Sequence, residues 1–195
     1  DLDLLAAMRK RGMTVVTSPE EFRALDFSKV QSIAGFFAKM HMATAPKREI
    51  PLPEMVENTL KVLSRNPKGF FLMVEGSQID WEGHGNNLRG NVDETLDFDR
   101  TVAKALEFAE KDGSTLVIVT ADHETGGLSI NDAAEKKGQI TAGWTHGDHT
   151  GSAVPLLACG PNAQAFAGLH HNFHIPQMAV QGWGVKNFAT FAYDK

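Results

Sequence analysis

The sequence holds one cysteine and one tyrosine among its 195 residues. The lone cysteine, Cys159, excludes an internal disulfide, and we expect it to be a small buried apolar residue because it follows an apolar run. No apolar run approaches the ~20 residues that cross a bilayer, so no membrane span is predicted. Basic clusters are also missing and the formal net charge is -5, which argues against a nucleic-acid partner because such binding rests on clustered Lys and Arg.

The chain begins at Asp1 without a methionine, a basic region or a signal-like apolar segment. A mature secreted protein, a processed product and an excised fragment would all begin in this way, so the three remain open. Hydrophobic residues make up 42% of the chain, enough for a substantial core. We expect residues 1–195 to form a single domain or a large piece of one.

Hydrophobic patterning indicates alternating strands and helices. Two continuously apolar, β-rich runs, residues 69–74 and 115–120, predict strands covered on both faces. Between them, helical spacing runs from about residue 92 to 111 and ends before Gly113. Weaker patterns predict strands at 14–17 and 155–158, and helices that begin at Pro19 and that cover 53–63 and 176–181. This order predicts an α/β fold with a mostly parallel sheet, in which ligands bind beyond the carboxyl ends of the strands.

Three groups of potential metal ligands follow the predicted strands. Asp80 and His84 are four residues apart, which places them on one face if a helical turn begins there. Asp122 and His123 are adjacent at the end of the second strong strand, and a glycine-bounded loop at 145–151 adds two His and one Asp. Each group alone is also typical of an ordinary surface turn or helix face. Their convergence at one sheet edge predicts a site for a metal such as zinc, which accepts imidazole and carboxylate ligands.

Four segments make the sequence recognisable: 68–80, 94–99, 116–123 and 149–152. Together they resemble the alkaline phosphatase family, from about Ser18 to the end and in the order of that family's carboxyl-terminal half. The resemblance implies a three-layer, doubly wound, mostly parallel sheet that is incomplete in this chain. It also implies metal-dependent hydrolysis of phosphate monoesters through a phosphoserine intermediate, with residues 131–145 forming a small surface excursion between ligand motifs.

The resemblance assigns metal ligands position by position, for two zinc ions and one magnesium ion in a complete active site. The zinc ions would act as a clamp on the attacking and leaving oxygens of an in-line phosphoryl transfer. Trp81 occupies a position that the family varies, where it would either flank the approach of phosphate or pack on the surface. The matching ligands are Glu75 for magnesium, Asp80, His84 and His149 for the first zinc, and Asp122 and His123 for the second zinc.

The family's nucleophile is a serine in an Asp-Ser-Ala-type element, and no Asp-Ser pair occurs in these residues. We therefore expect no catalytic residue in this chain and no turnover by the chain alone. Thr125 replaces a histidine that supports the second zinc in many bacterial members. The chain could instead be a metal-binding or structural fragment, or belong to a related phosphodiesterase, sulfatase or phosphoglycerate mutase. For the parent enzyme the resemblance implies a homodimer and a periplasmic or extracellular location.

Overall fold

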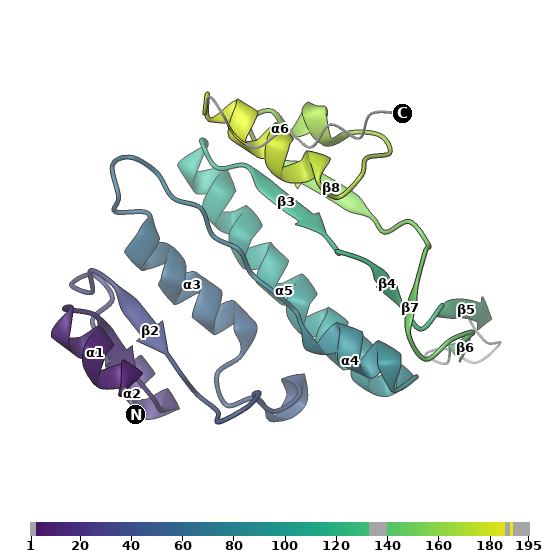
Figure 1. Cartoon of the computed structure of the whole chain (residues 1–195), viewed down its shortest axis with the longest axis horizontal. Coiled ribbons are helices and arrows are strands. Elements are labelled where there is room, and N and C mark those ends of the chain that lie inside the picture. The colour runs from purple at the N-terminus through teal and green to yellow at the C-terminus, as the bar shows by residue number, and fades with distance from the viewer. Residues whose placement is uncertain (1–2, 133–139, 186–187, 189–195) are drawn as a thin grey trace. The chain divides into compact units, whose positions relative to one another are not determined.

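A computed structural model describes residues 3–132, 140–185 and 188 (Figure 1). Its internal contacts divide the chain into two compact units. Unit 1 comprises residues 1–82 and 87–104, and unit 2 comprises residues 83–86 and 105–195. The expectation of one domain over residues 1–195 remains a prediction. Among the described helices, none combines the length and the apolar character that crossing a bilayer requires.

Unit 1 begins with a helix, strand, helix, strand sequence. Its two strands pair in parallel, with Val16 opposite Gly35. The second helix starts as its sequence predicts, because the Ser18 hydroxyl accepts the backbone N–H of Glu21 at 3.2 Å and caps the first turn. The elements are α1 (Leu4–Lys10), β1 (Thr14–Val16), α2 (Pro19–Arg23), β2 (Ile33–Gly35), η1 (Ala45–Lys47) and α3 (Leu52–Leu63). Helices α4 (Gln78–His84) and α5 (Leu88–Asp112) contribute residues to both units.

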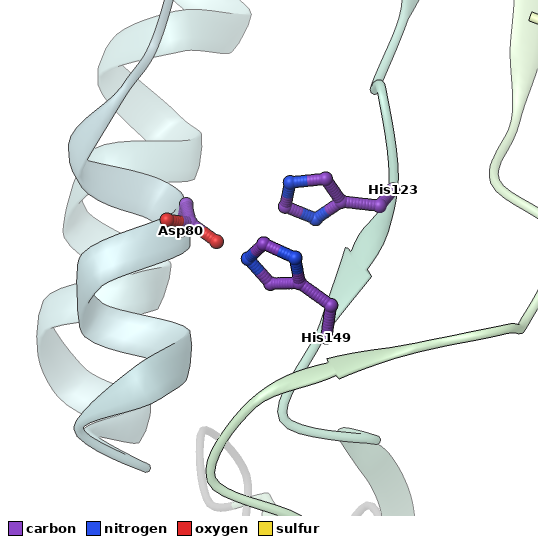
Figure 2. Close-up of side chains that lie close together, drawn as sticks. All are labelled: Asp80, His123 and His149. Carbon is purple, nitrogen blue, oxygen red and sulfur yellow. The ribbon is translucent and has the colours of Figure 1, made fainter.

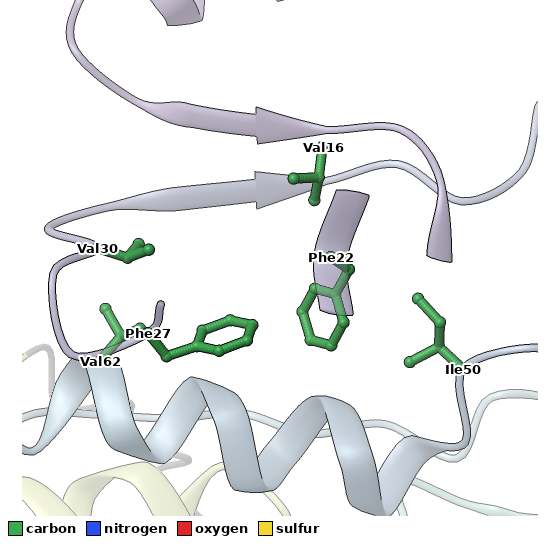
Figure 3. Close-up of a cluster of buried hydrophobic side chains, with 6 residues drawn as sticks. All are labelled: Val16, Phe22, Phe27, Val30, Ile50 and Val62. Carbon is green, nitrogen blue, oxygen red and sulfur yellow. The ribbon is translucent and has the colours of Figure 1, made fainter. Parts of the chain in front are cut away.

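The hydrophobic core of unit 1 forms where α2 and α3 meet the two strands (Figure 3). Phe22 and Phe27 pack edge to face with ring centroids 5.0 Å apart, and Ile50 is fully buried. Burying one such side chain contributes about 1.5–3 kcal/mol. Six buried side chains make up this cluster: Val16, Phe22, Phe27, Val30, Ile50 and Val62.

A buried ion-pair network joins α5 to the segment around η1. The Arg48 guanidinium contacts a carboxylate oxygen of Glu94 at 2.7 Å and one of Asp97 at 2.8 Å. Glu94 also accepts the backbone N–H of Ala45 at 2.6 Å. The two acidic residues are 2% and 3% exposed. The charge of Glu94 depends on Arg48 for compensation, whereas Asp97 also contacts Arg100 at 3.2 Å.

Unit 2 contains short antiparallel ladders. Strands β3 (Val117–Thr120) and β8 (Leu156–Cys159) pair with Thr120 opposite Leu156, and α6 (His174–Gly182) and η2 (Ala163–Phe166) follow β8. Strands β4 (Glu124–Thr125) and β7 (His149–Thr150) pair next to the predicted ligands. A hairpin of β5 (Ser129–Asp132) and β6 (Thr141–Gly143) forms the base of the predicted excursion, whose residues 133–139 lie outside the described part.

Most of the predicted elements are present, with boundaries shifted by a few residues. The helices predicted at 53–63, 92–111 and 176–181 are α3, α5 and α6, and the strands predicted at 14–17, 115–120 and 155–158 are β1, β3 and β8. Helix α5 ends as predicted, where the N–H of Gly113 donates to the carbonyl of Ala109 at 2.8 Å. Among the described ladders, only the β1 and β2 pair is parallel.

Two expectations are wrong. Residues 69–74 are assigned to no strand, because a strand requires a hydrogen-bonded neighbour and none of the described strands pairs with this segment. Its side chains still alternate between exposed and half-buried, as an extended chain requires. Cys159 is exposed, not buried, because it shares the exposed face of β8 with Leu157.

Candidate metal centre

Helix α4 carries the first pair of predicted ligands. Asp80 lies in its first turn and His84 in its last, so the two residues are one helical turn apart on the same face, as expected from their spacing. The side-chain amide of Asn91 donates to the carbonyl of Ile79 at 3.0 Å and fixes the start of this helix.

His84 and His149 form a close pair of predicted ligands in unit 2. Their Nε2 atoms lie 3.2 Å apart, and the Nδ1 of His84 lies 3.0 Å from the carbonyl oxygen of Gly147. A carbonyl only accepts, so Nδ1 of His84 carries the proton and its Nε2 lone pair is directed at His149. Two nitrogens at about 2.0–2.1 Å from one tetrahedral zinc are separated by about 3.4 Å. The observed spacing therefore fits two imidazoles that share one metal ion.

His123 lies against the same histidine. Its ring stacks on that of His149, with centroids 3.5 Å apart and an interplanar angle of 23°. Figure 2 shows the two rings next to one another. The Nε2 of His123 lies 3.4 Å from a carboxylate oxygen of Asp122, so these neighbouring residues present ligand atoms to a common point. The hydroxyl of Thr125 lies 3.2 Å from Nδ1 of His123. Thr125 thus orients this imidazole from its far side, the position from which an outer partner tunes a metal ligand.

Two glycines allow the loops that carry His123 and His149 to form hydrogen bonds with each other. The N–H of Gly126 donates to the carbonyl of Asp148 at 3.0 Å, and its own carbonyl accepts the N–H groups of Thr145 and His146 at 3.1 Å. Gly126 and Gly127 have φ of +89° and +58°, a region that disfavours other residues. A Cβ on Gly127 would also collide with the hydroxyl of Thr145. The Gly126-Gly127 turn therefore sets the distance between the His123 and His149 loops.

Asp148 is the aspartate of the 145–151 loop, which the sequence predicts as a source of metal ligands, although the family resemblance assigns it to no metal. Ligand atoms of His84, Asp148 and His149 all lie within 4.8 Å of one another. The Asp148 carboxylate accepts the backbone N–H of His149 at 2.8 Å. This hydrogen bond, together with the nearby imidazoles of His149, His84 and His146, lowers the pKa of Asp148. Its place in a glycine-bounded loop with two histidines was the available signal.

The remaining predicted site residues, Glu75 and Trp81, lie in unit 1. Both line a cavity of about 310 Å³, together with His41, Arg48 and Gln78. The Trp81 ring meets His41 edge to face, with centroids 4.9 Å apart, and is 47% exposed. Trp81 is thus partly open to solvent next to Asp80, which agrees with either of the two roles expected from the sequence.

Comparison with known proteins places this arrangement in a family. The family model described as alkaline phosphatase matches residues 1–136. Alkaline phosphatase 4 of Bacillus subtilis (strain 168) is 32% identical over 88% of this chain and 52% of its own length. Streptomycin-6-phosphate phosphatase of Streptomyces griseus is 32% identical over 88% of the chain and 44% of its own length. The chain thus spans about half the length of the curated relatives it matches.

Solved structures agree with this comparison. The alkaline phosphatase from the Antarctic bacterium TAB5 superposes with a TM-score of 0.83 at 33% identity, over 93% of this chain and 55% of that chain. A mutant of the TAB5 enzyme with Mg bound superposes with a TM-score of 0.85 at 32% identity, over 95% of this chain and 56% of that one. The fold is therefore the α/β alkaline phosphatase type, in incomplete form. The chain belongs to the alkaline phosphatase family.

Proposed function

We propose that this chain supplies the zinc and magnesium ligands of an enzyme that hydrolyses phosphate monoesters through a phosphoserine intermediate. The observation that carries the proposal is the 3.2 Å separation of the His84 and His149 Nε2 atoms, which suits two imidazoles on one zinc. The 3.4 Å separation between Nε2 of His123 and a carboxylate oxygen of Asp122 supports a second metal. Membership of the alkaline phosphatase family supports phosphate-ester hydrolysis as the reaction.

The proposed assignment gives each metal ligands of suitable chemistry. Imidazole nitrogen suits zinc, whereas magnesium prefers oxygen. When bound, the zinc ions would neutralise charge on the phosphate and lower the pKa of water toward 7. Magnesium would be held by Glu75, the first zinc by Asp80, His84 and His149, and the second zinc by Asp122 and His123.

Residues around these ligands would orient the imidazoles and flank the substrate. The Gly147 carbonyl and the Thr125 hydroxyl orient the imidazoles of His84 and His123. Trp81, partly exposed beside Asp80, would flank the approach of the ester. The attacking serine is not among these residues, since the sequence holds no Asp-Ser pair. We therefore propose that the 195-residue chain alone binds metal but does not turn over substrate.

The parent enzyme is proposed to act on phosphate monoesters, as a homodimer located in the periplasm or outside the cell. The relative named streptomycin-6-phosphate phosphatase supports a monoester substrate. A metal-binding or structural fragment without catalysis is the second candidate, and the chain's coverage of about half of its relatives favours it for the chain in isolation.

The test has two parts. The purified chain is loaded with zinc and magnesium, freed of unbound ions and analysed for metal content, and it is then assayed with an aryl phosphate, an aryl phosphodiester and an aryl sulfate. We expect zinc to remain bound and to be removed by a chelator, with no hydrolysis of any ester. Failure to retain zinc would refute the ligand assignment, whereas chelator-sensitive hydrolysis of the monoester would refute the predicted inactivity.

A further inference from the structure

Glu124 lies between the two loops that carry the proposed zinc ligands. It directly follows His123 and stands opposite Thr150 in the β4 and β7 ladder, while Thr125 stands opposite His149. This ladder pairs only two residues on each strand. So short a pairing has little stability of its own. Other contacts must therefore hold the two histidines at their observed stacking distance.

The Glu124 carboxylate supplies such contacts. It accepts a hydrogen bond from the Thr150 hydroxyl across the ladder. It also accepts the backbone N–H groups of Gly127 at 3.1 Å and Leu128 at 3.3 Å. The first bond reaches the residue that follows His149, and the other two close the turn that follows His123. One half-buried side chain thus joins β7, which carries His149, to β4, which directly follows His123.

The chemistry of these three contacts suits a carboxylate side chain. All three partners donate, and a carboxylate is the side chain that only accepts. Hydrogen bonds to an ionised acceptor are also about twice as strong as neutral ones. An amide at this position would direct an NH₂ group at one of the three donors.

We propose that Glu124 is a positioning residue of the zinc centre, which holds His123 and His149 at ligand spacing by tying β4 to β7 through Thr150. This inference rests on the proposed function, because it assumes that these imidazoles bind zinc. It assigns no contact with metal or substrate to Glu124 itself. Outer partners of this kind change metal affinity by about 10–100-fold.

The chain offers a matched control. Asp112, also in unit 2, accepts the N–H and hydroxyl of Ser114 at 3.1 and 2.7 Å and the hydroxyl of Thr115 at 2.7 Å. This carboxylate makes a similar set of three hydrogen bonds, but Asp112 precedes β3, whereas His123 and His149 both follow that strand. Asp112→Asn therefore measures the loss of a comparable hydrogen-bonded turn without a histidine attached.

The experiment compares the unaltered chain with Glu124→Gln, Thr150→Val, Thr150→Ser and Asp112→Asn. Zinc affinity is measured by competition with a chromogenic chelator, and the Co²⁺ absorption spectrum reports ligand geometry. We expect about 10-fold weaker zinc binding and an altered Co²⁺ spectrum in Glu124→Gln and Thr150→Val. Thr150→Ser, which keeps the hydroxyl, and Asp112→Asn should bind as the unaltered chain does. The double variant Glu124→Gln with Thr150→Val should lose less than the sum of the two, since both changes break one contact.

A metal-free measurement separates this inference from the proposed function. Nuclear Overhauser contacts between the ring protons of His123 and His149 should be present in the unaltered chain and in Asp112→Asn, and lost in Glu124→Gln. If the unaltered chain binds no zinc but the ring contacts behave in this way, the proposed function fails and the positioning role stands. Zinc affinity and ring contacts in Glu124→Gln that match those of Asp112→Asn would overturn the positioning role.

Discussion

The Nε2 atoms of His84 and His149 lie 3.2 Å apart although the residues are separated by 65 positions in the chain. His84 comes from a helix and His149 from a strand, so the pair depends on how the loops of unit 2 are held. Without a metal, one shared proton can occupy the space between the two nitrogens. With zinc bound, the Nε2 lone pairs of both histidines would coordinate the ion.

Replacing either histidine with alanine should weaken zinc binding more than the loss of an outer partner does. We expect at least about a 100-fold loss for His84→Ala and for His149→Ala. Isothermal titration of zinc into the purified variants measures this change. His170→Ala is the control, because His170 is a half-buried histidine of the same unit whose ring contacts the carbonyl of Ala167. Equal losses in all three variants would contradict the assignment.

Replacing Arg48 should lower the stability of unit 1, because Arg48 compensates buried acidic charges. Arg48→Ala leaves Glu94 buried without its cation and leaves Asp97 with Arg100 alone, and we expect a loss of about 3–5 kcal/mol in unfolding free energy. Urea denaturation followed by circular dichroism measures it. Arg48→Lys should recover only part of this loss, because one ammonium cannot reproduce two fork-shaped contacts.

The control for Arg48 is an exposed ion pair on helix α5. Arg89 contacts Asp93 at 2.9 Å with its side chain 85% exposed, so Arg89→Ala should cost about 0–1 kcal/mol. Equal losses of unfolding free energy in Arg48→Ala and Arg89→Ala would contradict a larger stabilising role for the buried network.

Gly127→Ala should affect both stability and metal binding. The substitution adds backbone strain at φ +58°, about 1–2 kcal/mol, and a collision with Thr145 in the loop before His149. Gly113→Ala isolates the strain, because Gly113 has φ +71° and a methyl group added there would meet no atom within 4 Å. We expect zinc affinity to fall only in Gly127→Ala, as measured by chelator competition. A fall of equal size in Gly113→Ala would mean that overall destabilisation explains the effect.

The Arg23 and Glu54 pair should make a small, pH-dependent contribution to the stability of unit 1. The hydrogen bonds from Arg23 lower the pKa of the Glu54 carboxyl below its ordinary value of 4.5. The stabilisation from this pair is therefore fully present at pH values above the ordinary pKa of about 4.5. It is lost as the pH falls through the lowered pKa of Glu54. Thermal melts between neutral and acid pH should show a shallower decline for Glu54→Gln than for the unaltered chain. Parallel declines would contradict this pairing.

The sequence predicted those features that local chemistry decides. Helix α2 follows from the Ser18 cap, and the Asp80 and His84 pair follows from helical spacing. The segment at 69–74 was mispredicted because its apolar run says nothing about which strand would pair with it. The closeness of His84 to His149 could not be derived from spacing, since it comes from the contact of His84 with the 145–148 loop, in which its Nδ1 lies 3.0 Å from the Gly147 carbonyl oxygen. Asp148 was among the potential ligands of this loop, but its grouping with His84 and His149 could not be derived from the sequence.

The short length of β4 and β7 also has a consequence for the rates at which a metal ion would bind and dissociate. Two paired residues on each strand, joined by loop and side-chain hydrogen bonds, can separate without opening the β3 and β8 ladder. Local openings of this kind require less free energy than global unfolding. Amide hydrogen exchange at Gly126, Thr145 and His146 should then report the same event that admits and releases zinc, and the residence time of the ion would be set by this small opening.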